Sequence, residues 1–207
     1  MDKIEFDAIE KDVLKEIGNM CAGNATTALA EILGRRIELE LPDMKVVSIA
    51  GLPGYLKVDP EEPVIGVHVQ IWGGVRGNAV MILSSKDAFS LLDTLLGLRQ
   101  DSPSALTEVG ISALKEIGNI VVNAYLSALS AITGISAFPS TVTLSSGAAK
   151  SVINLIFSGL HKDRPEETIL VEAHFKDKTR DLAGNFFVVF DVLSIGTILK
   201  KAQKLGK

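Results

Sequence analysis

The sequence predicts an α+β fold in which two related halves form an antiparallel sheet backed by two long helices around a pseudo-two-fold axis. The hexapeptide LKEIGN occurs at Leu14–Asn19 and again at Leu114–Asn119, an offset of 114 − 14 = 100 residues. A Gly-Asn dipeptide opens one predicted strand in each half, at Gly77-Asn78 and at Gly184-Asn185. The predicted elements also follow the same order in both halves, and internal repeats are strong evidence of architecture. We therefore predict a single domain over residues 1–207, made of two repeats at about 6–98 and 105–206.

The first half begins with a long amphipathic helix. Apolar residues recur at helical spacing from Phe6 to Leu33, and Gly34 then supplies a stop signal. Pro42 interrupts the alternating residues that follow, which predicts two short strands instead of one. Alternating apolar residues on both sides of Gly73-Gly74 predict a hairpin. The other elements predicted here are strands 36–41 and 45–49, a surface loop 51–63, hairpin strands 64–72 and 76–83, and a helix 86–96 that begins at Ser84 or Ser85 and ends at Gly97.

The second half repeats this order after a polar seam at Arg99–Ser104. A long helix is predicted from Ala105 to Thr133, with Gly134 as its stop signal. One segment differs between the halves, because Ala148–Phe157 is predicted to be helical where the first half has a loop. The remaining predicted elements are a strand at about 137–144 that Pro139 interrupts, hairpin strands 168–175 and 182–190, and a final helix 195–205.

Composition narrows the classes of protein that the chain can represent. Of the 207 residues 47% are hydrophobic, which is enough for a core, and the net charge of -4 lacks the basic excess that nucleic-acid binding requires. Cys21 is the only cysteine, which excludes an internal disulfide and a cysteine-rich zinc site. No apolar run approaches the roughly 18 residues of a membrane span, and the first residues do not resemble a signal peptide. We expect a cytoplasmic protein without nucleic-acid partners or membrane insertion.

The repeated hexapeptide places one carboxylate and one amide on the same face of each long helix. At about 100° per residue, Glu16 and Asn19 lie opposite the apolar stripe and face solvent. Glu116 and Asn119 lie in the same way on the second helix. Ordinary solvated residues that a duplication has kept alike are the alternative explanation. Exposed neighbours have diverged between the halves while both pairs remain identical, so we interpret the pairs as functional.

The hexapeptide also contains a glycine, at Gly18 and at Gly118. A glycine inside a helix costs roughly 0.5–1 kcal/mol relative to alanine. We expect each helix to pack closely on its neighbours at this point, which would offset that cost.

The sequence contains no self-sufficient catalytic set. His68, His161 and His174 are scattered, Cys21 lies on the buried helix face, and no phosphate-binding loop is present. One carboxylate for each pair is too few for a metal site. An exposed carboxylate can still pair with a cation of a partner, and an amide can orient an attacking water at a phosphoryl group. Such a protein would supply half of an active site, completed by a substrate that carries its own metal and phosphate.

A spacing pattern in the first half resembles that of a known family. Asp12, Glu16, Asn19 and Pro42 fit [D/S]xxxExxN followed by 22 residues and proline, since 42 − 19 − 1 = 22. This pattern resembles the CheC/CheX/FliY family of chemotaxis phosphatases.

The second half matches the same pattern except for its proline. Ser112, Glu116 and Asn119 fit it, whereas Pro139 follows after 139 − 119 − 1 = 19 residues. The resemblance therefore does not define the geometry of the second site.

The resemblance implies a phosphatase that acts on the aspartyl phosphate of the response regulator CheY. It implies that Asn19 and Asn119 orient the hydrolytic water, and that Glu16 and Glu116 anchor a lysine of CheY. No cofactor is expected on this chain, because the CheY substrate carries the Mg²⁺. The receptor deamidase CheD is implied as a second partner, for which the extra helical segment Ala148–Phe157 is a candidate interface.

Two other functions remain as alternatives. One is a non-catalytic interaction module, either an adaptor that binds CheD or a motor-switch-like protein, although switch proteins of the FliM type lack the Glu/Asn pair. The other is an autonomous hydrolase of small phosphate esters, which the missing catalytic set disfavours.

Overall fold

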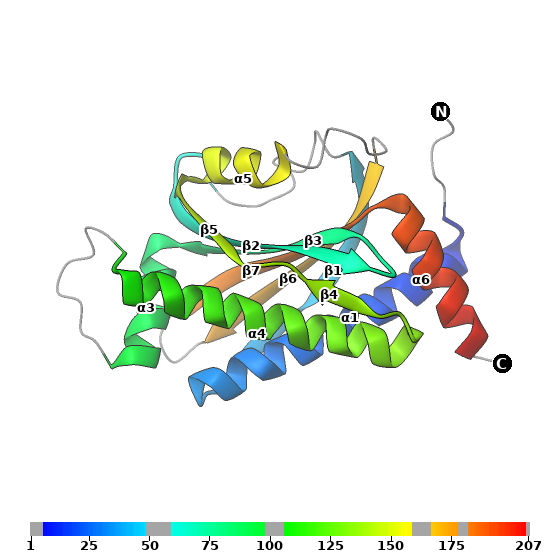
Figure 1. Ribbon diagram of the computed structural model, residues 1–207, viewed down its shortest axis with the longest axis horizontal. Coiled ribbons are helices and arrows are strands. Elements are labelled where there is room, and N and C mark those ends of the chain that lie inside the picture. The colour runs from blue at the N-terminus through cyan, green and yellow to red at the C-terminus, as the bar shows by residue number, and fades with distance from the viewer. Residues whose placement is uncertain (1–5, 49–58, 98–105, 159–166, 178–181, 206–207) are drawn as a thin grey trace.

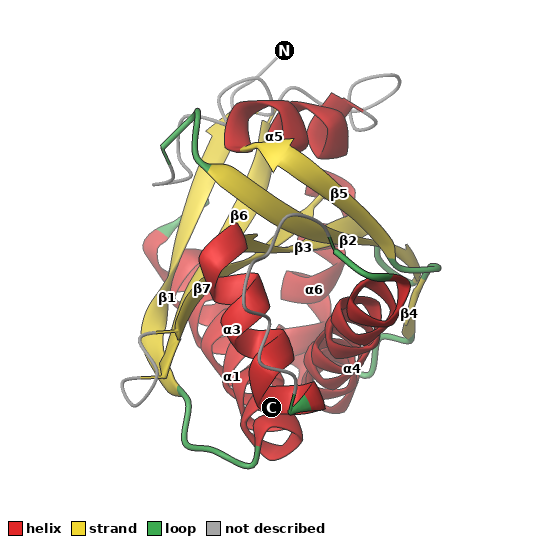
Figure 2. Ribbon diagram, turned by 90° about the vertical axis from the view of Figure 1, so that its left-hand side faces the viewer, coloured by secondary structure: helices red, strands yellow, loops and turns green. Residues whose placement is uncertain are grey.

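The computed structural model describes residues 6–48, 59–97, 106–158, 167–177 and 182–205. Within them, strands form one curled antiparallel sheet with helices on both faces (Figures 1 and 2). The strands are β1 (Glu38–Ser48), β2 (Pro63–Gly73), β3 (Gly77–Ser84), β4 (Ala137–Pro139), β5 (Thr143–Ala148), β6 (Glu167–Asp177) and β7 (Leu182–Phe190). The helices are α1 (Ala8–Leu33), α3 (Ser85–Leu96), α4 (Glu108–Thr133), α5 (Ala149–Ser158) and α6 (Val192–Leu205).

The sheet interleaves strands from the two halves of the chain. Its order is β1-β6-β7-β3-β2-β4, and β5 also pairs with β2. The first strand of each half thus joins the edge of the other half's hairpin, and the two hairpins meet at the β3–β7 pair. That central register runs from Gly77 opposite Phe190 to Ile82 opposite Asn185. The predicted α+β fold, with its pseudo-two-fold antiparallel sheet, is confirmed. The division into repeats at about 6–98 and 105–206 stays a prediction.

The two long helices begin and end at equivalent residues of the halves. Both contain 26 residues, and Figure 1 shows them running in opposite directions along the same face of the sheet. Asp7 caps α1 through a capping box with Glu10, and the Thr107 hydroxyl caps α4. Gly34 and Gly134 end the helices in the left-handed conformation, with φ of 59° and 66°. Both predicted stop signals are confirmed, and α4 begins three residues later than predicted.

Each face of the sheet carries its own apolar core. The larger core joins α1, α3, α4 and α6 to one face, and Tyr125 and Phe186 are in tilted ring contact there, 5.8 Å between centroids. The smaller core lies between the opposite face and α5. Because both faces are covered, strand β3 is buried along nearly its whole length. The smaller core consists of Val64, Val80, Ile82, Ala149, Val152, Ile153, Ile156, Leu170, Phe187 and Val189.

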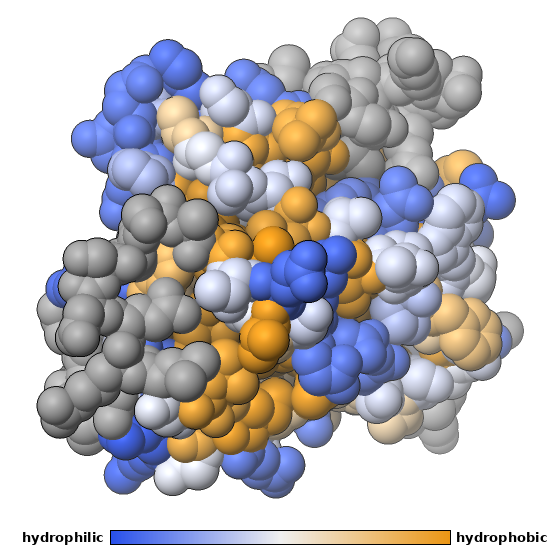
Figure 3. All heavy atoms as spheres, turned by 60° about the vertical axis from the view of Figure 1, so that its left-hand side comes forward, coloured by the Kyte–Doolittle hydropathy of each residue, from blue (hydrophilic) through white to orange (hydrophobic). Residues whose placement is uncertain are grey.

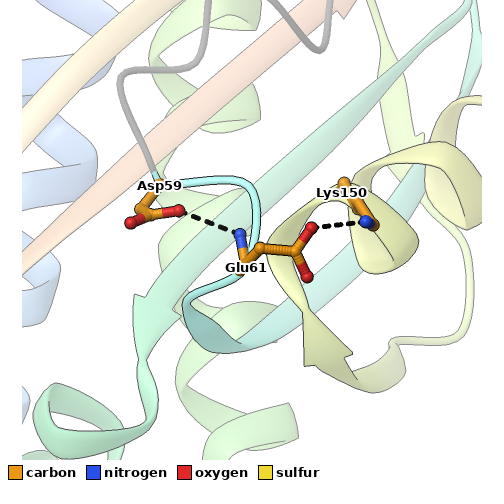
Figure 4. Close-up of polar contacts among 3 residues, drawn as sticks. All are labelled: Asp59, Glu61 and Lys150. Carbon is orange, nitrogen blue, oxygen red and sulfur yellow. Dashed lines mark hydrogen bonds and ion pairs between the residues drawn. The ribbon is translucent and has the colours of Figure 1, made fainter.

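Helix α5 is fastened to the turn that precedes β2. The backbone N–H groups of Ala149 and Lys150 donate to the carbonyls of Glu62 and Pro60, at 2.9 Å and 3.0 Å. Lys150 also forms an exposed ion pair with Glu61, whose N–H is bonded to Asp59 (Figure 4). These contacts satisfy donors at the start of α5 that have no partner within the helix. The predicted helical segment at 148–157 is confirmed.

Only one of the two prolines divides its strand as the sequence predicts. The sequence predicts two strands, 36–41 and 45–49, but β1 is continuous and pairs with β6 on both sides of Pro42. Its register shifts between Glu40 and Asp43, so Pro42 lies in a bulge, where a missing N–H costs no ladder bond. Pro139 does interrupt its strand: it ends the short strand β4, and β5 resumes pairing with β2 four residues later, at Thr143.

Apolar residues also reach the surface at the end of the molecule that carries α3. Figure 3 shows apolar side chains among charged ones on this side. Phe89, Leu95, Leu96 and Leu106 are only partly buried there, packed against the larger core. Among the described residues, no helix is long and apolar enough to cross a membrane.

Candidate functional site

The structure places each predicted Glu/Asn pair at the same point of its long helix. Glu16 and Glu116 are exposed, as predicted from the helical spacing. Asn19 and Asn119 are half-buried, so they face solvent less fully than expected. Each asparagine lies one turn after its glutamate, which allows one partner surface to contact both side chains.

A groove lies beside the second pair, Glu116 and Asn119. It has a volume of about 410 Å³ and separates α4 from the connection between β4 and β5. Ser112, Glu116 and Asn119, which carry the sequence pattern, all contribute side chains to the helical wall. The complete lining is Ser112, Lys115, Glu116 and Asn119 from α4, with Ser140, Thr141 and Val142 from the connection.

Close packing holds the two walls of this groove in position. A Cβ atom on Gly118 would lie 2.5 Å from Cγ1 of Val67 and 3.7 Å from Cγ1 of Val142, so only glycine lets α4 approach the sheet here. Ser140 anchors the opposite wall, because its N–H donates to the Gln70 carbonyl at 2.8 Å and its Oγ accepts from the Gln70 N–H at 3.0 Å. The close packing predicted at Gly118 is confirmed.

The groove also shows what replaces the missing proline of the second half. Pro42 follows Asn19 by 23 positions, and the residue 23 positions after Asn119 is Val142. Val142 lines the groove, whereas Pro139 is paired with Ile71 in the sheet. The connection between β4 and β5 is thus the counterpart of the β1 bulge. Val142 occupies the position in this connection that Pro42 occupies in the first half.

The asparagine of the second pair is held by a residue one turn further along α4. Asn123 donates from Nδ2 to Oδ1 of Asn119 at 2.9 Å and to the Asn119 carbonyl at 2.8 Å. The sequence places Asn123 on the same helix face without indicating this role. The sequence feature that could have indicated it is the spacing of four between Asn119 and Asn123, because residues i and i+4 are neighbours on a helix.

The first pair has a different surrounding. Oδ1 of Asn19 is buried and has no hydrogen-bond partner among the described residues. A buried carbonyl oxygen without a partner costs about 1–3 kcal/mol, so a hydrogen bond donated to this atom would be favourable. The side chains of 39–48, including Pro42, lie outside the described residues.

Cys21 is buried in the larger core, on the same helix as the first pair, and is chemically protected. Its side chain is 0% exposed, and burial raises the pKa of the thiol to about 12. Since the thiolate is the reactive form, we expect iodoacetamide at pH 8 to leave the native protein unmodified and to alkylate Cys21 only after unfolding. Mass spectrometry of the intact chain measures this directly, and rapid modification of the folded protein would contradict the buried position.

Two histidines each bond to the asparagine of a Gly-Asn dipeptide. Nε2 of His68 lies 2.8 Å from Oδ1 of Asn78, and burial lowers the pKa of His68 while this bond partly offsets the shift. His174 bonds to Asn185 in the second half. Neither histidine lines the groove beside Glu116, and His161 lies outside the described residues.

Comparisons with known proteins agree with the sequence pattern. A model of the CheC-like family matches residues 9–45, the segment that contains Glu16 and Asn19. CheY-P phosphatase CheC of Bacillus subtilis is 28% identical over 186 residues, which cover 88% of this chain and 88% of that protein. The flagellar motor switch phosphatase FliY of Bacillus subtilis is 22% identical over 129 residues, or 62% of this chain, but these cover only 33% of that longer protein.

A solved structure shows the same fold. The crystal structure of Thermotoga maritima FliY superposes with a TM-score of 0.73 at 22% identity, and the match covers 97% of this chain and 99% of that chain. Together with the sequence matches, it confirms the predicted resemblance to the CheC/CheX/FliY family.

Proposed function

From this resemblance to the CheC-like proteins, we propose that the chain is a cytoplasmic chemotaxis phosphatase that hydrolyses the aspartyl phosphate of CheY at two active sites. The observation that carries the proposal is the groove in which Glu116 and Asn119 line the same wall. The pair recurs as Glu16 and Asn19 on α1, at an equivalent position. A groove beside an exposed helix face can receive the surface of another protein, and the curated relatives are named as phosphatases of CheY-P or of the motor switch.

The asparagine amide supplies the chemistry that this chain contributes. Its Oδ1 accepts a hydrogen bond from a water placed in line with the phosphoryl group, as an amide does in GTPases. The water oxygen then bonds to phosphorus, the bond between phosphorus and the aspartyl oxygen breaks, and both water protons leave with the phosphate. The products are the CheY carboxylate and inorganic phosphate. Mg²⁺ carried by the CheY substrate would neutralise charge on the phosphate oxygens, and the proposal assigns no cofactor to this chain.

The glutamate positions the regulator instead of reacting with it. Glu16 and Glu116 are exposed carboxylates one turn from the amides, and each pairs with a lysine of CheY. That pair becomes partly desolvated when CheY docks, which strengthens it relative to an ion pair in water.

The decay of phosphorylated CheY tests the proposal. CheY loaded with acetyl phosphate and Mg²⁺ should lose its phosphate faster when this protein is added in catalytic amounts. A decay rate that does not change with protein concentration, up to a large excess over CheY, would refute the phosphatase function.

The role of Glu116 can be isolated in a variant that keeps only the second site. In an Asn19→Ala background, we expect Glu116→Gln to lower kcat/KM for CheY-P by about tenfold, mostly through a higher KM, because the lost carboxylate binds CheY. Steady-state phosphate release measures both constants. Glu31→Gln makes the same charge change at an exposed residue outside the groove and should leave KM unaltered. An unchanged KM in Glu116→Gln would contradict the anchoring role.

CheD is the second partner of the proposal, and α5 is its candidate surface. The helix covers the sheet face opposite α1 and α4 (Figure 2), and its Leu155 is 64% exposed. Repeating the CheY-P assay with CheD present separates the two alternatives. Faster decay on addition of CheD supports a regulated phosphatase, whereas CheD binding without any CheY-P hydrolysis supports the non-catalytic adaptor.

A further inference from the structure

The two proposed active sites differ at one residue that follows each asparagine by one turn. Asn123 stands at this position in the second half and Gly23 in the first, at the offset of 100 that relates the two helices. Asn123 donates to Oδ1 of Asn119 at 2.9 Å, and it is fastened itself by a 2.8 Å bond to the Asn119 carbonyl. The Asn119 amide therefore has a defined orientation before any partner binds.

The first site has no such donor. Gly23 carries no side chain, and Oδ1 of Asn19 is buried without a hydrogen-bond partner among the described residues. The space that a side chain would need is open, since a Cβ built on Gly23 meets nothing within 4 Å. An asparagine at this position could reach Oδ1 of Asn19 as Asn123 reaches Oδ1 of Asn119.

The orientation of the amide matters because its two ends do different chemistry. The oxygen accepts hydrogen bonds and the nitrogen donates them, so a rotated amide presents the wrong group to the attacking water. An amide oxygen has two acceptor positions, of which Asn123 occupies one and leaves the other for water. Reactions that depend on a held geometry lose rate when that geometry is populated only part of the time.

We propose that Asn123 is a positioning residue that pre-orients Asn119, and that Gly23 leaves Asn19 without this support. The second site is then preorganised and has the higher turnover, whereas the first must orient its amide as CheY docks. The prediction about turnover rests on the proposed function, but the orientation of Asn119 does not.

Two reciprocal substitutions test the effect on turnover. With Asn19→Ala, so that only the second site acts, Asn123→Ala should lower kcat for CheY-P by roughly threefold to tenfold at unchanged KM, because a positioning residue acts on the chemical step. With Asn119→Ala, so that only the first site acts, Gly23→Asn should raise kcat by a similar factor. Gly23→Ala is the matched control, since it also adds a Cβ and improves the helix but supplies no donor. Its kcat should equal that of the Gly23 parent.

The side-chain amide of Asn119 tests the orientation without any substrate. Relaxation of its ¹⁵N side-chain resonance should report an ordered amide in the wild-type protein and a markedly more mobile one in Asn123→Ala, with the backbone of α4 unaffected. Unchanged order in Asn123→Ala would overturn the inference. If wild-type protein accelerates CheY-P decay, the inference also fails when Asn123→Ala retains full kcat or when Gly23→Asn is no faster than Gly23→Ala. If wild-type protein has no phosphatase activity, the proposed function fails and the relaxation measurement alone decides this point.

Discussion

Replacement of both asparagines, Asn19→Ala with Asn119→Ala, is expected to abolish the acceleration of CheY-P decay and to leave the protein folded. Removal of one oriented hydrogen-bonding group from a catalytic site commonly lowers kcat by about 10²–10³-fold, and this variant removes the amide from both sites. The fold should survive because both side chains are only half-buried and alanine is the better helix former. Phosphate release from CheY-P measures the activity, and circular dichroism measures the fold.

The matched control is Asn24→Ala on the same helix. Asn24 is exposed and donates only to the Met20 carbonyl in the described structure, at 2.9 Å, so its loss should not affect hydrolysis. The two single variants should each retain the activity of the other site. Full activity in a folded double variant would show that the amides do not carry the reaction.

Gly77→Ala should produce the largest loss of stability among the glycine positions at the centre of the sheet. A Cβ at Gly77 would lie 2.4 Å from the Val189 carbonyl oxygen and 2.9 Å from Cδ1 of Phe190. The oxygen belongs to the backbone of the β3–β7 pair and cannot rotate away, so the strands must separate. Overpacking of this kind costs about 3 kcal/mol in the free energy of unfolding, which a urea titration measures as a lower midpoint.

Gly184 provides a second measurement and Gly196 a control. A Cβ at Gly184 would lie 2.1 Å from Cζ of Phe175, so Gly184→Ala should also destabilise the sheet. Gly196 lies within α6 with nothing within 4 Å of a Cβ, and its replacement by alanine should stabilise the protein by up to about 1 kcal/mol. Gly77→Ala with the stability of the wild type would contradict the observed β3–β7 approach.

Much of the fold could be predicted because its signals are local. Helix caps and stop glycines act through the nearest backbone groups, so Gly34, Gly97 and Gly134 all end helices as expected. The first hairpin follows from alternation on both sides of Gly73-Gly74, and the second from alternation in residues 168–175 and 182–190. Predictions from local pattern were wrong at Pro42, because pairing with β6 carries β1 past the proline as a bulge.

The candidate site also has a part that could be predicted from local sequence and a part that could not. The duplicated hexapeptide and helical spacing were enough to predict that Glu16 and Asn19, and likewise Glu116 and Asn119, share a helix face, since residues i and i+3 are neighbours whatever surrounds the helix. The groove beside Glu116 was not predictable, because the connection between β4 and β5 that forms its second wall reaches α4 only through pairing with β2.

The sequence by itself determined that the chain is duplicated, which helix faces carry the Glu/Asn pairs, and which family the pattern resembles, because all three are properties of residue spacing. Only the tertiary structure decided how the halves combine. Each half gives its first strand to the other's hairpin, and a strand's partner depends on contacts distant in sequence. It also showed different surroundings for the two identical Glu/Asn pairs, because a hydrogen bond from Asn123 and the space beside Gly23 are properties of side-chain packing.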